Sequence, residues 1–343
     1  MAKLGAVNRN LVCSVILTAA VAMAAPALAA DEIALGISWK AQVEMGGYYQ
    51  ALATGIYEKH GLKVTIFQGG PQVNQRQFLI NGRRDFILEP SIYSALSYPR
   101  EGIPMVAVAG IFQRSPQGLM AHPDNAEIKS LADIAGKPVM VANSMRETYW
   151  YYLKSKYGFT DGQIRPYTFN LGPFLADKKA IQQVYATSEP YVVRTKAGFE
   201  PKVFLLSDFG YEDYAQMLVT PQKLAREKPE LVQRFVNASI EGWYSLLYGD
   251  PTPGFALIKR DNPEQTQDLM EFARKALRDL KIIDDGDART LGIGAMTEAR
   301  WQRVTQLATD SGFFPAGKEH KSAYTLQFVN KKHGMGAAQG TAK

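Results

Sequence analysis

From Glu32 onward, short runs of β-branched and apolar residues alternate with amphipathic stretches, and glycine or proline stands at most of the junctions. The pattern predicts a strand over 33–38, a helix over 46–59 that ends at Gly61, and a second strand over 62–68. Strands and helices joined by such short connections are typical of a parallel sheet covered by helices on both faces. The chain is therefore predicted to be an α/β protein.

The alternation restarts after about residue 113, and beyond about residue 209 it changes to long helical patterns. A chain of 343 residues exceeds the usual size of one hydrophobic core, so we expect two lobes joined by two chain crossings. Residues 31–112 and 210–328 are assigned to a first lobe, and residues 113–209 to a second lobe. Residues 329–343 are rich in Gly, Ala and Lys, and we expect them to be a disordered tail.

The first 30 residues have the pattern of a secretory signal peptide. A positively charged start precedes an apolar run over 11–25, and Ala-Leu-Ala at 27–29 is the small-x-small pattern that signal peptidase recognises. Cleavage after Ala29 or Ala30 exports the chain to the periplasm. No later stretch has the roughly 20 consecutive apolar residues that a membrane span requires.

Cysteine, histidine and net charge exclude several function classes. The only cysteine, Cys13, lies in the predicted signal peptide, so the mature chain has no thiol for catalysis, redox chemistry or a Cys-rich zinc site. His60, His122, His320 and His333 are far apart in the sequence and are never paired at helical spacing, which gives no support for a histidine-based metal site. The charge of +6 is spread along the chain and does not predict nucleic-acid binding. We expect no catalytic residue, metal or cofactor.

Polar and aromatic residues follow several predicted strands. In open α/β sheets, ligands bind at the carboxyl ends of the strands, where the loops surround a crevice. This rule predicts ligand contacts for Trp39, Gln68, Glu89, Asn143, Ser188 and Glu189, and it places Gln113, Asn170 and Thr187 in equivalent positions.

Two of these residues, Glu89 and Glu189, each stand between a predicted strand and a proline that begins a helix. Proline suits the first helical turn, so each glutamate can simply cap the helix that follows. Capping positions favour Asp, Asn, Ser and Thr over Glu, which leaves a ligand contact open for both residues.

Four segments carry a resemblance to a known family: Trp39, GGYYQA at 46–51, GIYEKHGLKV at 55–64 and YATSEP at 185–190. With them, the chain resembles periplasmic solute-binding proteins of ABC importers. The similar branch includes binders of thiamine pyrimidine precursors and, more distantly, of sulfonates and nitrate. The resemblance implies a type II periplasmic-binding-protein fold, with the ligand cleft between two lobes. It also implies a monomer that delivers its solute to a membrane permease and its ATPase.

In pyrimidine-binding members, an aromatic ring and an acidic side chain hold the heterocycle and its exocyclic amine, and the resemblance gives these roles to Trp39 and Glu189. Stacking on a planar ring adds about 0.5–1.5 kcal/mol beyond area burial, and a buried carboxylate makes a charge-assisted hydrogen bond to an amino group. Tyr48, Tyr93 and Tyr185 are further candidates for the walls of the cleft, with packing in the protein core as the alternative for Tyr48 and Tyr93.

Two alternatives remain open at this stage. The same fold can bind an oxyanion such as an alkylsulfonate or nitrate, but a buried acidic residue repels an anion, so Glu189 favours a neutral or cationic ligand. Enzymes of the same fold that synthesise the pyrimidine depend on a Cys-rich iron-binding segment, and the mature chain has no cysteine to form one. The sequence therefore predicts a binding protein rather than an enzyme.

Overall fold

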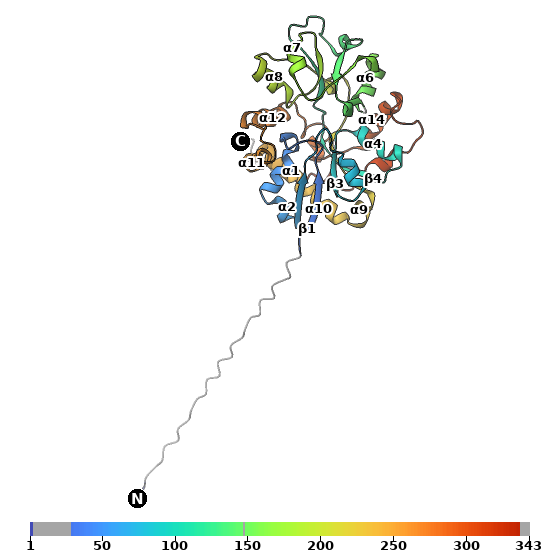
Figure 1. The fold of residues 1–343 in the computed structure, drawn as a ribbon. Coiled ribbons are helices and arrows are strands. Elements are labelled where there is room, and N and C mark those ends of the chain that lie inside the picture. Colours follow the sequence, from blue (N-terminus) through green and yellow to red (C-terminus); the bar gives the residue numbers. More distant parts are fainter. Residues whose placement is uncertain (3–28, 147, 337–343) are drawn as a thin grey trace.

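The computed structural model describes residues 1–2, 29–146 and 148–336 (Figure 1). The predicted signal peptide therefore lies almost entirely outside the described residues, as does the end of the expected tail at 337–343. In the part that is described, none of the helices has both the length and the apolar character to cross a membrane.

The first lobe is built on a five-stranded mixed sheet with the strand order β2-β1-β3-β10-β4. Its strands are β1 (Asp31–Gly36), β2 (Leu62–Phe67), β3 (Phe86–Glu89), β4 (Met105–Phe112) and β10 (Ala215–Pro221). Strands β2, β1 and β3 are parallel, whereas β10 pairs antiparallel with both β3 and β4. The sequence pattern predicted a parallel sheet, and this was wrong at β10 because that strand enters the first lobe from the second.

The second lobe has a five-stranded sheet with the order β7-β6-β8-β5-β9. Its strands are β5 (Gln117–Ala121), β6 (Val139–Val141), β7 (Ile164–Pro166), β8 (Ile181–Tyr185) and β9 (Lys202–Leu205). Strand β6 pairs parallel with β7 and β8, and β5 lies antiparallel between β8 and β9. Both sheets thus place the carboxyl ends of their parallel strands toward the junction of the lobes, where Figure 1 shows the two meeting.

Helices cover the two sheets. In the first lobe they are α1 (Gly46–Ala53), α2 (Ile56–Lys59), α3 (Gln75–Ile80), α4 (Ile92–Glu101), α9 (Gln222–Glu227), α10 (Pro229–Tyr248), α11 (Thr252–Asp261), α12 (Gln267–Asp279), α13 (Ala288–Leu291) and α14 (Glu298–Asp310). In the second lobe they are α5 (Asn143–Arg146), α6 (Tyr149–Tyr157), α7 (Gly172–Ala176) and α8 (Glu189–Ala197). The helix predicted over 46–59 is divided at Gly55, whose φ of 69° does not continue a right-handed helix.

The longest helix, α10, packs against α1 through two glycines. A Cβ atom on Gly242 would overlap the backbone oxygen of Gly47, and a Cβ on Gly47 would overlap the ring of Trp243. The two helix backbones can approach this closely because neither glycine has a side chain. Trp243 is fully buried, and Tyr48 packs edge-on against it with ring centroids 6.0 Å apart.

The chain passes between the sheets twice, over 113–116 and over 206–214. After the second crossing, the remaining helices return to the first lobe, as expected from the late helical pattern. The segment 329–336 also packs there: Val329 is buried, Asn330 donates a side-chain hydrogen bond to Met296 O at 2.8 Å, and Lys332 N bonds Leu291 O at 3.0 Å. Composition alone did not reveal these contacts.

Candidate ligand-binding cleft

The two lobes meet through an acidic residue of the first lobe and a hydroxyl of the second. Glu44 lies in the short 3-10 helix Val43–Met45 that precedes α1, and its side chain is almost fully buried. The buried Thr187, in the turn between β8 and α8, donates a hydrogen bond to Glu44 Oε1. A carboxylate from one lobe is thus bound directly by the other.

Glu189 stands beside this contact as the first residue of α8. Its Oε2 accepts a hydrogen bond from Tyr185 N at 3.0 Å, and the backbone of Ser188 also turns back to Tyr185, with N···O 2.9 Å. Ser188 is the N-cap of α8, but its side chain makes no capping hydrogen bond. Tyr185, Ser188 and Glu189 are all partly exposed at the end of β8. The turn therefore presents three of the predicted residues at the junction of the lobes.

Three carboxyl groups in this region have raised pKa values. Burial raises the pKa of Glu44 from 4.5 to about 7, against the opposing effect of the Thr187 hydrogen bond. Burial likewise raises the pKa of Glu189 to about 7; the backbone hydrogen bond from Tyr185 opposes this, and the charge of Glu44 adds to it. Burial raises the pKa of Asp213 from 3.8 to about 8. Near pH 7, these groups can therefore be charged or neutral at small cost.

Glu189 and Asp213 are accompanied by buried polar atoms without a well-aligned hydrogen-bond partner among the described residues, although the Tyr211 hydroxyl and the Asp213 carboxyl face each other. They are the hydroxyls of Tyr93, Tyr149 and Tyr211, Oδ2 of Asp213 and Oε1 of Gln216. Their proximity is seen in the raised pKa values: Glu189 raises the pKa of the Tyr149 hydroxyl, and Asp213 raises those of Tyr93 and Tyr211, in each case after the effect of burial. A buried polar atom without a partner costs about 1–3 kcal/mol, so this row of atoms is suited to a polar ligand.

An aromatic pair bridges the lobes near the same site. The ring of Trp39, in the loop after β1, lies 4.4 Å from the ring of Phe169, in the loop after β7, at an interplanar angle of 48°. Tyr167 packs against the other side of this pair, 5.1 Å from Phe169. Phe169 has φ 62° and Gln216 has φ 51°, a left-handed conformation that residues other than glycine rarely adopt. Such strained residues cluster at functional sites.

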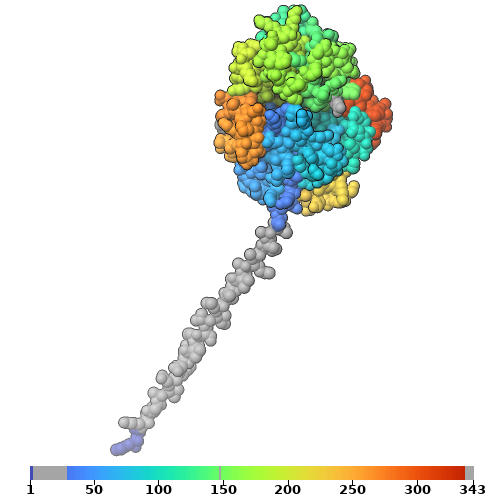
Figure 2. Space-filling model, in the orientation of Figure 1, coloured from blue at the N-terminus to red at the C-terminus, as the bar shows by residue number. Residues whose placement is uncertain are grey.

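The lobes also touch on both flanks of the cleft. Tyr191 of α8 lies 5.4 Å from Phe272 of α12, and Tyr151 of α6 lies 5.2 Å from Phe313 of the first lobe. Figure 2 shows the second lobe resting on the first, with the helices of residues 250–280 beside it. The lobes are thus in contact on both sides of the cleft, with Glu44 and Asp213 buried and Glu189 partly exposed.

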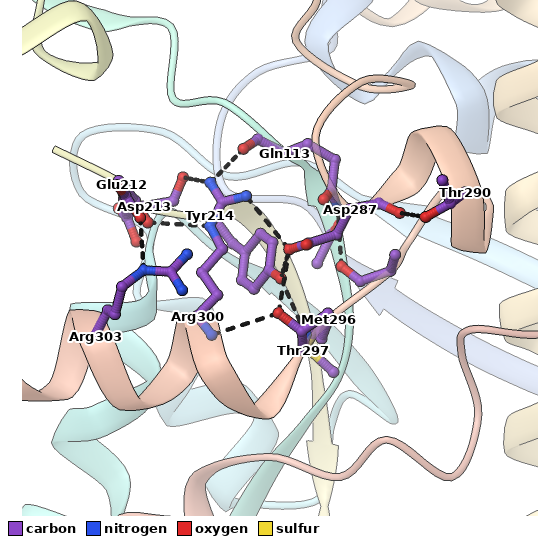
Figure 3. A network of polar contacts seen from close by, with 12 residues as sticks. Gln113, Glu212, Asp213, Tyr214, Asp287, Thr290, Met296, Thr297, Arg300 and Arg303 are labelled. Carbon is purple, nitrogen blue, oxygen red and sulfur yellow. Dashed lines mark hydrogen bonds and ion pairs between the residues drawn. The ribbon is translucent and has the colours of Figure 1, made fainter. Parts of the chain in front are cut away.

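Both chain crossings are held by one arginine of the first lobe (Figure 3). Arg300 of α14 donates hydrogen bonds to Gln113 O in the first crossing, and to Glu212 O and Asp213 O in the second, the latter two at 3.1 and 3.2 Å. Its guanidinium lies 4.1 Å from the centre of the Tyr214 ring. The crossings therefore share one anchor next to Asp213, and any change in the angle between the lobes must alter its contacts.

The remaining predicted residues are engaged elsewhere. Gln68 Oε1 accepts from Ala41 N at 2.8 Å, and Gln68 Nε2 donates to Asp261 O at 3.0 Å, so this side chain fixes loops of the first lobe. Glu89 pairs with Arg76 within the first lobe. Tyr48 is buried against Trp243, which is the core-packing alternative.

Asn143 lies apart from the acidic groups, exposed at the start of α5. It borders a hollow of about 410 Å³ on the second lobe, lined by Asn143, Arg146, Trp150, Tyr151, Lys154 and Asp161. The structure therefore brings together Trp39, Tyr93, Tyr185, Ser188 and Glu189 at the junction of the lobes and leaves Asn143 outside this group.

Sequence reasoning missed Glu44, Asp213 and Gln216. Glu44 follows the first strand and stands two residues before Gly46, the first glycine of the pair that begins α1, so the strand-end rule could have included it. Asp213 and Gln216 precede or begin β10, a strand that the sequence pattern did not predict. Without that strand, neither residue had a place at the cleft.

Comparisons with known proteins agree with this architecture. A family model described as NMT1/THI5 like matches residues 42–252. The riboflavin-binding protein RibY of Chloroflexus aurantiacus is 25% identical over 322 residues, which cover 91% of this chain and 91% of that protein.

Among solved structures, the periplasmic aliphatic sulphonate-binding protein SsuA of Escherichia coli matches with a TM-score of 0.60 and 15% identity, covering 85% of this chain and 91% of that chain. The desulfurization enzyme DSZB matches with a TM-score of 0.57 and 11% identity, covering 88% and 98%. The structural neighbours are mostly solute-binding proteins, and they confirm the predicted two-lobe periplasmic-binding-protein fold. At these identities they establish the fold alone.

Proposed function

Because the chain belongs to the NMT1/THI5-like family of solute-binding proteins, we propose that it captures a small planar nitrogen heterocycle between its lobes. It delivers this solute to an ABC permease and its ATPase in the inner membrane. The observation that carries the ligand class is the group of buried carboxyls, Glu44, Glu189 and Asp213, set among unpartnered polar atoms.

The chemistry of these carboxyl groups matches the edge of a heterocycle. An ionised carboxylate accepts hydrogen bonds from ring N–H and exocyclic amino groups, and a neutral carboxyl both donates and accepts. With pKa values of about 7, Glu44 and Glu189 can adopt whichever form the bound ring requires. Trp39 and Phe169 contact each other across the lobes with ring centroids 4.4 Å apart, and a planar solute that opens this contact can stack on the aromatic surface.

The three carboxyl groups disfavour the binding of an oxyanion. Within the described residues, Glu44, Glu189 and Asp213 form no ion pair with Lys, Arg or His, so a sulfonate placed among them is repelled by whichever of these carboxyl groups are ionised. Arg300, the cation beside Asp213, is already bound to backbone oxygens of the two crossings. An alkanesulfonate is therefore the alternative ligand class in the experiment below.

The relative RibY adds one specific probe, because its name states that it binds riboflavin. The isoalloxazine ring of riboflavin is planar and carries an N–H group between two carbonyls, so it belongs to the proposed ligand class. We therefore place riboflavin beside an aminopyrimidine as a candidate solute.

Export is part of the proposal. The fold begins at Asp31, whose backbone N bonds Gly61 O at 3.0 Å, so cleavage after Ala29 or Ala30 leaves every described strand intact. The matched binding proteins include periplasmic ones. N-terminal sequencing of periplasmic protein is expected to begin at Ala30 or Asp31, and recovery of intact Met1 from a membrane fraction would contradict export.

Calorimetric titration of the mature, ligand-stripped chain with riboflavin, an aminopyrimidine and an alkanesulfonate tests the ligand class. We expect one of the two heterocycles to bind. Glu189→Gln is expected to weaken that binding by about 1.5–3 kcal/mol, the range for a hydrogen bond to a charged group. Trp39→Ala is expected to weaken it through lost stacking. The matched control is Glu127→Gln, an exposed glutamate of the second lobe that pairs with Lys137.

The sign of the Glu189→Gln effect distinguishes the classes. An oxyanion site predicts unchanged or tighter sulfonate binding after the charge is removed. Sulfonate binding of that kind, with no response to either heterocycle, would overturn the proposal. Mass spectrometry of solute retained through gentle purification identifies the ligand independently.

A further inference from the structure

Three residues that are distant in the sequence meet at the end of the first lobe opposite the cleft. His60 directly follows α2, Glu241 lies in α10, and His333 lies in the C-terminal segment 329–336. The Nε2 atoms of His60 and His333 lie 2.9 and 2.7 Å from the same atom, Glu241 Oε1. All three candidate ligand atoms are within 4.8 Å of one another.

We propose that His60, Glu241 and His333 form a binding site for a divalent transition metal ion, with Zn²⁺ as the best match. Two imidazole nitrogens and one carboxylate oxygen are a typical zinc ligand set, completed by water in a fourth position. Mg²⁺ and Ca²⁺ prefer oxygen ligands and do not suit a site with two imidazoles.

The geometry permits this set with small movements. Zinc bonds to nitrogen and oxygen of about 2.0–2.2 Å in a tetrahedral arrangement separate neighbouring ligand atoms by roughly 3.4 Å. The two Nε2–Oε1 distances must therefore lengthen by about half an ångström, which rotations of partly exposed side chains allow. The side chains of His60, Glu241 and His333 are 20%, 34% and 31% exposed, so an ion and a water ligand can reach them from solvent.

Arg234, a cation beside the cluster, is already paired. Arg234, two turns before Glu241 on α10, donates to His60 O at 2.9 Å and forms an ion pair with Asp31. Its charge is thus directed at a backbone oxygen and a carboxylate rather than at the three ligand atoms. This leaves Glu241 as the acceptor for both imidazoles.

A bound ion would fasten the C-terminal segment to the first lobe. His333 is adjacent to Gly334, whose φ of 73° lets the chain turn closely against the ring of Tyr244 on α10. Lys331 and Lys332 precede it and are exposed cleavage sites for trypsin. Metal binding should therefore protect this segment from trypsin, independently of the solute in the cleft.

The direct test is calorimetric titration of the mature, tag-free, chelator-treated chain with ZnCl₂. We expect one zinc ion per chain, no binding of Mg²⁺, and slower trypsin cleavage after Lys331 and Lys332 when zinc is present. His60→Ala, His333→Ala and Glu241→Gln should each weaken zinc binding at least about tenfold. His320→Ala is the matched control, because this partly buried histidine lies outside the cluster and should leave zinc binding unchanged.

If a variant fails to fold, X-ray absorption spectroscopy of the zinc-loaded wild type tests the site without any substitution. Two imidazoles in a nitrogen and oxygen shell at about 2.0–2.1 Å support the site. Absence of zinc binding would show that the three residues form hydrogen bonds only. Stoichiometric binding that none of the three substitutions weakens would place the ion elsewhere, and either result would overturn the proposal.

Discussion

Glu89 of the first lobe and Glu189 of the second lobe are both followed by proline, but the side chains around the two carboxyl groups differ. Each glutamate directly precedes a proline: Glu89 is the last residue of β3, and Glu189 is the first residue of α8, four residues after the end of β8. Glu89 is paired: Arg76 Nε lies 3.2 Å from its Oε1, and the Tyr98 hydroxyl donates to the same oxygen at 2.5 Å. The guanidinium of Arg76 also lies 4.7 Å from the centre of the Tyr98 ring. The carboxylate of Glu89 is thus fully used by its own lobe.

Glu189 has no such cation. Among the described residues it is approached by the backbone N–H of Tyr185 and by the hydroxyl of Tyr167, and its pKa is raised to about 7 by burial, with the charge of Glu44 adding to the effect. The comparison shows that a Glu-Pro pair fixes only the position of the glutamate in the chain. The side chains that face it from other elements, α3 and α4 for Glu89 and the opposite lobe for Glu189, decide whether it stabilises the fold or remains available to a ligand.

Among single substitutions, the largest expected effect on stability comes from removing the cation that pairs with Glu89. Arg76→Met leaves the Glu89 carboxylate buried without its ion-pair partner, a change that costs about 3–5 kcal/mol when both groups are fully buried. Because the side chain of Arg76 is 27% exposed, we expect a loss near 3 kcal/mol in the free energy of unfolding, measured in urea.

The double variant Arg76→Met with Glu89→Gln is the control, because it removes the unpaired charge. It should recover much of the lost stability. A loss below about 1 kcal/mol in the single variant would mean that Glu89 does not depend on Arg76, and the contrast with Glu189 would fail.

The second effect is a pH dependence that comes from the cleft. In the unfolded chain, carboxyl groups ionise near their ordinary pKa values of 3.8 to 4.5, whereas Glu44 and Glu189 in the folded chain do so at about 7 and Asp213 at about 8. Between these values, the folded chain holds more protons than the unfolded chain. The free energy of unfolding of the unliganded protein should therefore fall as the pH rises from about 5 to about 8.

Each of the three carboxyl groups contributes up to about 1.4 kcal/mol per pH unit in this range, and urea titrations at several pH values measure their combined effect. The double variant Glu44→Gln with Glu189→Gln should have a flatter profile, with the remaining slope from Asp213. A wild-type profile that is flat or rises over this range would show that the three carboxyl groups ionise freely in the folded protein.

Much of the fold followed from local sequence patterns. The periodicity of residues 31–112 predicted strands β1 to β4 and the helices between them, because apolar spacing and glycine positions act locally. Strands β5 and β10 were missed, and both are the antiparallel members of their sheets. Their pairing depends on where the chain returns after a crossing, which no local pattern records.

Only part of the candidate site could be predicted from the sequence. The strand-end rule predicted Trp39 and Glu189 at the junction of the lobes, because both follow parallel strands, and their contact with a ligand stays a prediction. It could not separate them from Gln68, whose amide bonds Ala41 and Asp261. It also gave no sign that His60 and His333 meet at Glu241, because that contact is made between segments more than 90 residues apart. Contacts between distant elements, rather than residue type, separate ligand positions from structural ones.

The smallest expected effect tests the comparison most directly, because one substitution is made at both Glu-Pro positions. At pH 8, Glu89→Gln removes the charge that Arg76 needs and should lower the free energy of unfolding of the unliganded chain by about 1 kcal/mol. Glu189→Gln removes a charge that is unfavourable because of burial and because of the neighbouring Glu44. This substitution should raise the free energy of unfolding by a similar amount. At pH 5, where Glu189 is already protonated in the folded chain, the gain from Glu189→Gln should disappear. Urea unfolding of both variants at the two pH values measures this, and the same sign of change at pH 8 would show that the two carboxylates have equivalent surroundings.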